Sequence, residues 1–98
     1  MRELIIRVKE IKGRCDVYKP GDRIVIKGPR IDMEKTDGLC IHALPSLLYY
    51  GLALREGADP VKLGLSTVND RAYLSCPDPG PPYTQGGNVV FEFILEDA

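Results

Sequence analysis

Three cysteines and a single histidine are the residues of this sequence whose types could do chemistry together. Cys15, Cys40 and Cys76 lie far apart in the chain, and His42 stands two positions after Cys40. Thiolate and imidazole are the ligands that Zn²⁺ prefers in closed tetrahedral sites. The set predicts a binding site for a metal ion or a small ligand formed by Cys15, Cys40, Cys76 and His42. Zinc sites usually take their cysteines in close pairs, which are missing here, and isolated cysteines often serve as small buried apolar residues.

Cys40 also allows a different hypothesis, a thiol-dependent or redox enzyme. It stands just ahead of a predicted helix, whose positive end lowers the pKa of a nearby thiol, although Asp37 opposes that effect. Cys15 or Cys76 would then be the resolving thiol. His42 could act as a base only if the backbone turns tightly, because side chains two positions apart on a helix do not face each other. The sequence lacks the common catalytic motifs, so whether the protein is an enzyme stays open.

The elements that must position these residues follow from periodicity and turn chemistry. Alternating apolar residues predict strands over residues 4–9, 23–27, 71–76 and 89–95. Ile11 breaks the alternation of the first strand, which predicts either a bulge after Val8 or the end of the strand. Residues 19–22, Lys-Pro-Gly-Asp, suit a type II turn. Each cysteine thus falls at the end of a predicted element, where sites are commonly built.

A helix is predicted over residues 44–56, with Pro45 tolerated in its first turn. Its expected sheet-facing stripe is Leu44, Leu47, Leu48, Gly51 and Leu52. The expected fold is therefore α+β, a mainly antiparallel sheet of about four strands packed on one main helix, in a single domain over residues 1–98. Apolar residues make up 44% of the chain and charged residues 28%, which is typical of a globular protein.

Charge and hydropathy limit the expected partners. A formal net charge of −1 makes nucleic acid an unexpected partner, because phosphate binding needs a concentrated basic surface. The uncharged stretch 39–54 is shorter than the roughly 20 residues that span a bilayer, so no membrane association is expected. An odd number of cysteines without an export signal predicts a cytoplasmic location. A third functional hypothesis is a structural or homo-oligomeric protein that uses Tyr49, Tyr50 and the proline loop as its contact surface.

The motifs around the cysteines also resemble a known family. Cys15 followed by Tyr-Lys-Pro-Gly-Asp, then Asp-Gly-Leu-Cys before an apolar helix, then Ser-Cys-Pro-Asp-Pro before a last strand, is similar to a family of small prokaryotic proteins without an established activity. The resemblance covers nearly the whole chain. It implies that the cysteines are family features with a shared role, and it implies no particular cofactor or partner.

Overall fold

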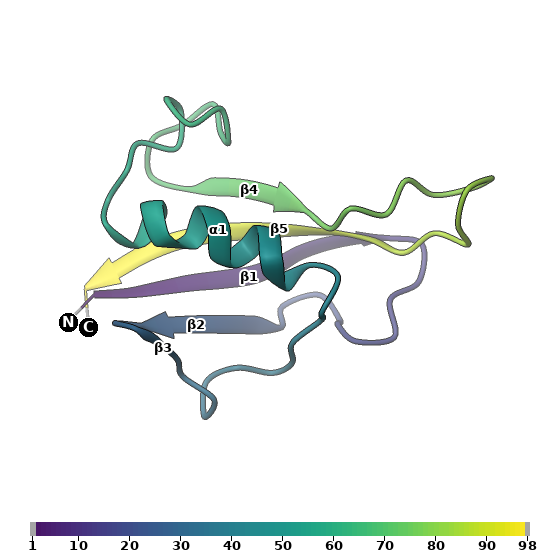
Figure 1. The fold of residues 1–98 in the computed structure, drawn as a ribbon, viewed down its shortest axis with the longest axis horizontal. Coiled ribbons are helices and arrows are strands. Elements are labelled where there is room, and N and C mark those ends of the chain that lie inside the picture. Colours follow the sequence, from purple (N-terminus) through teal and green to yellow (C-terminus); the bar gives the residue numbers. More distant parts are fainter. Residues whose placement is uncertain (1, 98) are drawn as a thin grey trace.

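The computed structural model describes residues 2–97 and shows an α+β fold in which a helix covers one face of a sheet (Figure 1). In chain order the elements are β1 (Arg2–Lys12), β2 (Arg23–Lys27), β3 (Arg30–Ile31), α1 (Leu44–Arg55), β4 (Ala72–Ser75) and β5 (Asn88–Asp97). The strands pair antiparallel in the order β3-β2-β1-β5-β4. The fold class is confirmed, but residues 2–97 form five strands instead of about four. The chain turns back at residues 28–29, and the short β3 pairs with the end of β2.

The alternating side chains of β1 form the centre of the core. Leu4, Ile6 and Val8 are buried on the face that α1 covers. The pairing of β1 with β5 shifts register between Val8 and Glu10. One extra residue reverses the alternation, so the bulge lets Ile11 pack against the same core. The strand therefore continues past the bulge, which decides between the two outcomes predicted from the sequence.

The helix α1 packs on the sheet through a stripe that differs from the predicted one. Leu47, Gly51 and Leu54 are its buried residues, while Leu48 and Leu52 are 38% and 60% exposed. Gly51 marks the closest approach, because a Cβ placed there would lie 3.4 Å from Ile26 Cδ1 and 3.6 Å from Leu4 Cδ2. The helix therefore turns its glycine towards the sheet and two leucines towards solvent.

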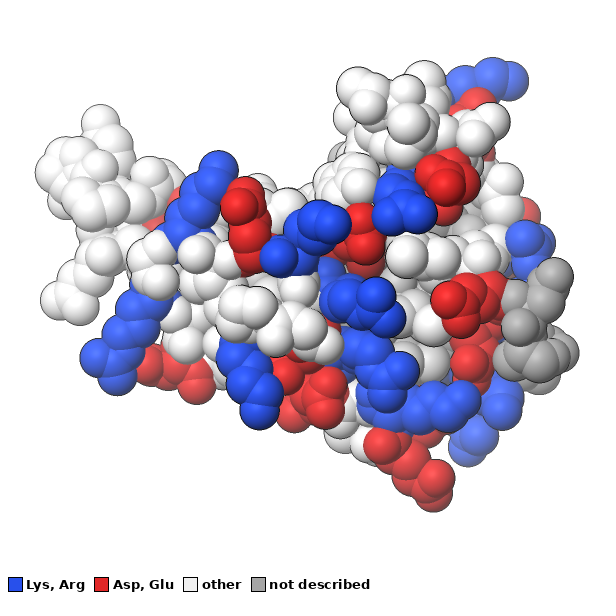
Figure 2. All heavy atoms as spheres, turned by 180° about the vertical axis from the view of Figure 1, so that it is seen from behind, with Lys and Arg blue, Asp and Glu red and all other residues white. Residues whose placement is uncertain are grey.

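The opposite face of the sheet carries charged side chains of both signs (Figure 2). Glu92 is buried there at 3% exposure, and its carboxylate accepts hydrogen bonds from Tyr73 Oη (2.9 Å) and Arg71 Nη1 (3.2 Å). Burial raises the pKa of Glu92, but the hydrogen bonds from Tyr73 and Arg71, aided by Lys9, outweigh that effect and hold the pKa below its ordinary value. Hydrogen bonds and ion pairs around Glu92 therefore stabilise this face, which the helix α1 does not cover.

One end of the sheet extends beyond the helix. The start of β5, with Val89 and Phe91, lies past the first turn of α1, and loops from residues 13–22, 38–43 and 76–87 surround it (Figure 1). All three cysteines lie in these loops. The fold thus gathers the residues that the sequence singled out at the end of the sheet that the helix leaves uncovered.

Candidate functional site

A pocket of about 580 Å³ opens at this end of the sheet. Its lining is mainly apolar and includes Phe91 and Val89 of β5 together with Tyr18 and Ala43. Cys15, Cys40, Cys76 and His42 all line it as well. Four residues from three separate segments of the chain therefore line one cavity.

Cys15 reaches the pocket because two glycines allow backbone to pass against backbone. Gly13 and Gly87 have φ values of +91° and +110°, which residues with a side chain rarely adopt. A Cβ on Gly13 would lie 3.0 Å from the Gly87 nitrogen, and a Cβ on Gly87 would overlap the carbonyl oxygen of Arg14. This contact brings the segment that carries Cys15 against the loop that follows Cys76.

Cys76 continues the antiparallel pairing of β4 with β5. Its N–H donates to the carbonyl oxygen of Val89 (2.9 Å), and its thiol accepts the Val89 N–H (3.1 Å). The same Sγ donates to the carbonyl oxygen of Gly87 (3.5 Å). The backbone of β5 therefore fixes the position of this thiol.

Tyr18 connects the other two cysteines. Its N–H donates to Cys15 Sγ (3.4 Å), and its hydroxyl oxygen accepts the N–H of Cys40 (3.0 Å). Its ring meets Phe91 edge to face, with centroids 5.5 Å apart. Burial raises the pKa of the Tyr18 hydroxyl; the Cys40 N–H acts in the opposite direction, and the nearby Cys40, Cys15 and Asp22 raise the pKa further. Tyr18 therefore stays protonated at neutral pH.

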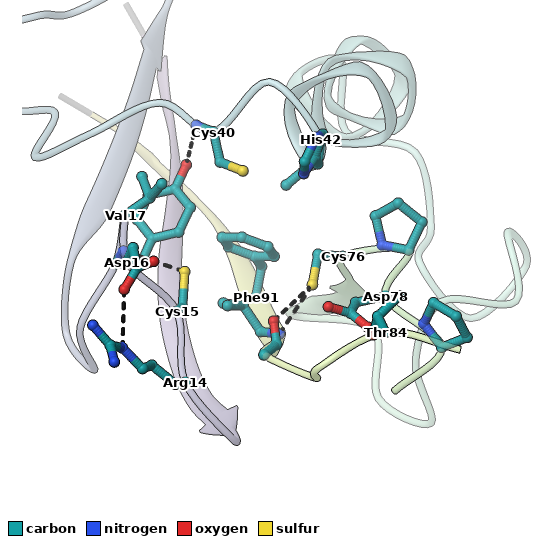
Figure 3. A pocket seen from close by; sticks show the side chains of 16 residues that line it. Arg14, Cys15, Asp16, Val17, Cys40, His42, Cys76, Asp78, Thr84 and Phe91 are labelled. Carbon is teal, nitrogen blue, oxygen red and sulfur yellow. Dashed lines mark hydrogen bonds and ion pairs between the residues drawn. The ribbon is translucent and has the colours of Figure 1, made fainter. Parts of the chain in front are cut away.

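His42 and Asp78 face the pocket from the side opposite Cys15 (Figure 3). Asp78 accepts hydrogen bonds from the Thr84 hydroxyl and from the Gly80 N–H (2.8 Å). Those two bonds hold the pKa of Asp78 below its ordinary value, and His42 adds a smaller effect in the same direction. This carboxylate shapes the proline loop and stays charged near neutral pH.

The three sulfurs lie on different walls of the pocket (Figure 3). Within residues 2–97, no three side chains of His, Cys, Asp or Glu are grouped as ligands of one metal ion. All three cysteines are free thiols of intermediate burial. The structure thus brings the four predicted residues to one cavity without arranging them as a metal centre.

The position of Cys40 relative to α1 bears on the enzyme hypothesis. The helix begins at Leu44 with Ala43 as its N-cap, so residues 41–43 separate Cys40 from the first turn. The influence of a helix dipole falls off within about one turn. In the described part of the chain no hydrogen bond joins Cys40 to His42. The structure thus places Cys40 three residues ahead of the N-cap of α1, and the enzyme hypothesis stays a prediction.

Sequence reasoning did not assign a role to Tyr18, Thr84 or Phe91. Tyr18 belongs to the Tyr-Lys-Pro-Gly-Asp motif, whose turn forms as predicted: the Asp22 N–H donates to the Lys19 carbonyl (3.1 Å) and Gly21 has φ +91°. The position of Tyr18 at the start of that motif was the sequence signal that could have drawn attention to it. Its partner, the backbone of Cys40, could be found only in three dimensions.

Comparisons with family models, curated protein sequences and solved structures give no match to this chain. The resemblance to a family of small prokaryotic proteins stays a prediction. No helix in residues 2–97 is long and apolar enough to cross a membrane.

Proposed function

We propose that this protein is a small binding module whose cysteine-lined pocket holds a small, mainly apolar ligand. The observation that carries the proposal is the convergence of Cys15, Cys40, Cys76 and His42 on one cavity of about 580 Å³. Pockets that bind small molecules typically have volumes of about 300 to 1,000 Å³, apolar walls and a few placed polar groups. This cavity fits each of those features.

A small ligand is favoured over a metal ion because of what the thiols already contact. Cys76 Sγ has a hydrogen-bond donor and an acceptor on the backbone, and Cys15 Sγ has a donor from Tyr18. A shared zinc ion would displace the proton that Cys76 donates to Gly87, and it would require the sulfurs, which lie on different walls (Figure 3), to meet at bonds of about 2.3 Å. An organic ligand in the middle of the pocket leaves every one of these bonds in place.

Titration of ¹⁵N-labelled protein with a set of small apolar fragments tests the proposal. We expect fragments to shift the amide resonances of Cys15, Cys40 and Cys76. His42→Trp should weaken binding at least about tenfold, because His42 is exposed at the edge of the pocket and a larger ring there fills space without disturbing the core.

Leu52→Trp is the matched control for this experiment. It places the same indole in a second apolar hollow, beside α1, β2 and β3, and should leave binding at the cysteines unchanged. Fragments that shift only the residues of this second hollow, or no residues at all, would contradict the proposed function. Analysis of bound zinc in the same preparation checks the metal alternative, which requires about one ion per chain.

A second candidate function is self-association through the outer side of α1. Tyr49 is 74% exposed and Leu52 60% exposed, and the residues around them are uncharged from Leu39 to Leu54. Exposed apolar side chains grouped in this way are typical of contact surfaces. Light scattering across a concentration series tests this candidate: a dimer that Leu52→Glu converts to a monomer supports it, and a monomer at all concentrations contradicts it.

A further inference from the structure

The hydroxyl of Tyr18 holds an unused hydrogen-bond donor inside the pocket. A phenol can donate one hydrogen bond and accept others. The Tyr18 oxygen accepts the Cys40 N–H at 3.0 Å, yet within residues 2–97 the structure shows no acceptor for the hydroxyl proton. Tyr18 is 5% exposed as a whole residue and is one of the residues that line the pocket. The oxygen therefore has a partner, while its proton remains free to donate to an acceptor on a ligand.

The surroundings of this hydroxyl indicate what kind of acceptor it would meet. The hydroxyl contacts the Cys40 backbone, and the Cys40, Cys15 and Asp22 side chains raise its pKa through their charge. Thiols are only weak acceptors. In the lining of the pocket Arg14 already pairs with Asp16 (3.0 Å), and Asp78 adds a second carboxylate. An anionic ligand oxygen beside Tyr18 would be desolvated without a free cation to compensate it. A neutral acceptor avoids that penalty.

We infer that the ligand of this pocket carries a neutral carbonyl group on an apolar body, and that the carbonyl oxygen accepts a hydrogen bond from the Tyr18 hydroxyl. This inference rests on the proposed function, since it names the chemical class of the ligand that the pocket binds. The apolar body lies over Phe91 and Val89, and the carbonyl points to the wall where Tyr18 and Cys40 meet. Tyr18 is then the residue that sets specificity.

Three probes of similar shape separate these contributions: acetophenone, ethylbenzene and benzoate. Their Kd values are measured by amide shifts in the wild-type protein, in Tyr18→Phe and in the control Tyr49→Phe, whose ring is exposed on α1. We expect the preference for acetophenone over ethylbenzene to fall about fivefold in Tyr18→Phe, which is the typical effect of one hydrogen bond. The preference should be unchanged in Tyr49→Phe, and benzoate should bind more weakly than acetophenone to the wild-type protein.

A second measurement needs no variant. In protein labelled with ¹³C at tyrosine Cζ, acetophenone should shift the Tyr18 Cζ resonance and ethylbenzene should leave it nearly unchanged. A preference that survives in Tyr18→Phe together with an unmoved Cζ resonance would overturn the inference, as would tighter binding of benzoate. In both cases the probes still bind at the pocket and the proposed function stands. Failure of every probe to shift pocket residues would overturn the proposed function itself.

Discussion

The contact between Gly13 and Gly87 makes Gly87→Ala the sharpest test of how the pocket is built. At φ +110° an alanine is strained, which costs about 1 to 3 kcal/mol. The added Cβ also overlaps the Arg14 carbonyl oxygen, so the segment with Cys15 must move away from β5. Overpacking of this kind costs a further 1 to 3 kcal/mol or so. We expect a total loss of about 2 to 6 kcal/mol, a large share of the roughly 5 to 15 kcal/mol that stabilises a small domain.

Gly86→Ala is the matched control for this prediction. Gly86 has φ +100°, nearly that of Gly87, but a Cβ there meets only Pro81 Cδ at an ordinary 3.7 Å. It should therefore lose only the strain energy, partly offset by the lower entropy of the unfolded chain, a net cost of about 1 to 2 kcal/mol. The difference between the two variants isolates the backbone contact.

Urea unfolding followed by circular dichroism measures both variants, with the free energy of unfolding taken from the midpoint and slope. A second readout is the rate of alkylation at Cys76, which should rise in Gly87→Ala because the carbonyl that accepts its thiol proton moves. Equal losses of stability in Gly86→Ala and Gly87→Ala, with unchanged alkylation, would refute the claim that close backbone approach places Cys15 against the pocket.

Three further predictions concern single groups. Glu92→Gln should flatten the dependence of stability on pH. The pKa of Glu92 is lowered in the folded state, so its contribution to the free energy of unfolding is present above the pKa of the unfolded state and is lost as the pH falls through the folded-state pKa. Measuring the free energy of unfolding across an acid titration would show this. Thr84→Val should raise the pKa of Asp78 by removing its strongest hydrogen bond, as measured by the carboxyl ¹³C shift, and an unchanged pKa would contradict the assigned cause. Iodoacetamide should modify Cys40 faster than Cys76, whose thiol is hydrogen-bonded to β5, and mass mapping that finds the reverse order would contradict this geometry.

The sequence predicted those parts of the fold that depend on local patterns. The strand predicted over residues 23–27 has the same bounds as β2. Its β-branched residues favour a strand, and the Pro-Gly turn before it and the Gly-Pro pair after it set its two ends. The two-residue β3 has no period to detect, so it was missed. The predicted helix stripe was right for Leu47 and Gly51 and wrong for Leu48 and Leu52. The physical reason is that α1 has no charged residue before Arg55, and a helix that is apolar all round does not indicate which side faces the core.

The candidate site was predictable in part for a similar reason. The sequence placed each cysteine at the end of an element, which allows a shared edge of the sheet, but it left open whether the three meet in space. The role of Tyr18 was beyond sequence reasoning, because it depends on a hydrogen bond to the backbone of Cys40, which no residue type signals. Whether convergent thiols form a metal centre or the walls of a cavity also depends on separations that only the folded chain fixes.

The pocket exists because α1 stops short of the end of the sheet, and Pro45 explains why it stops there. A proline lacks the N–H that would bond to the carbonyl of Ile41, so it is tolerated only in the first turn of a helix. The helix therefore begins at Leu44, and the one helical bond beyond it, from the Leu44 N–H to the Cys40 carbonyl (2.9 Å), ends at the cysteine itself. One further turn of helix would extend over the pocket that Phe91 lines. The same proline that limits the helix thus leaves Cys40 and His42 on irregular backbone, where their side chains can turn into the cavity.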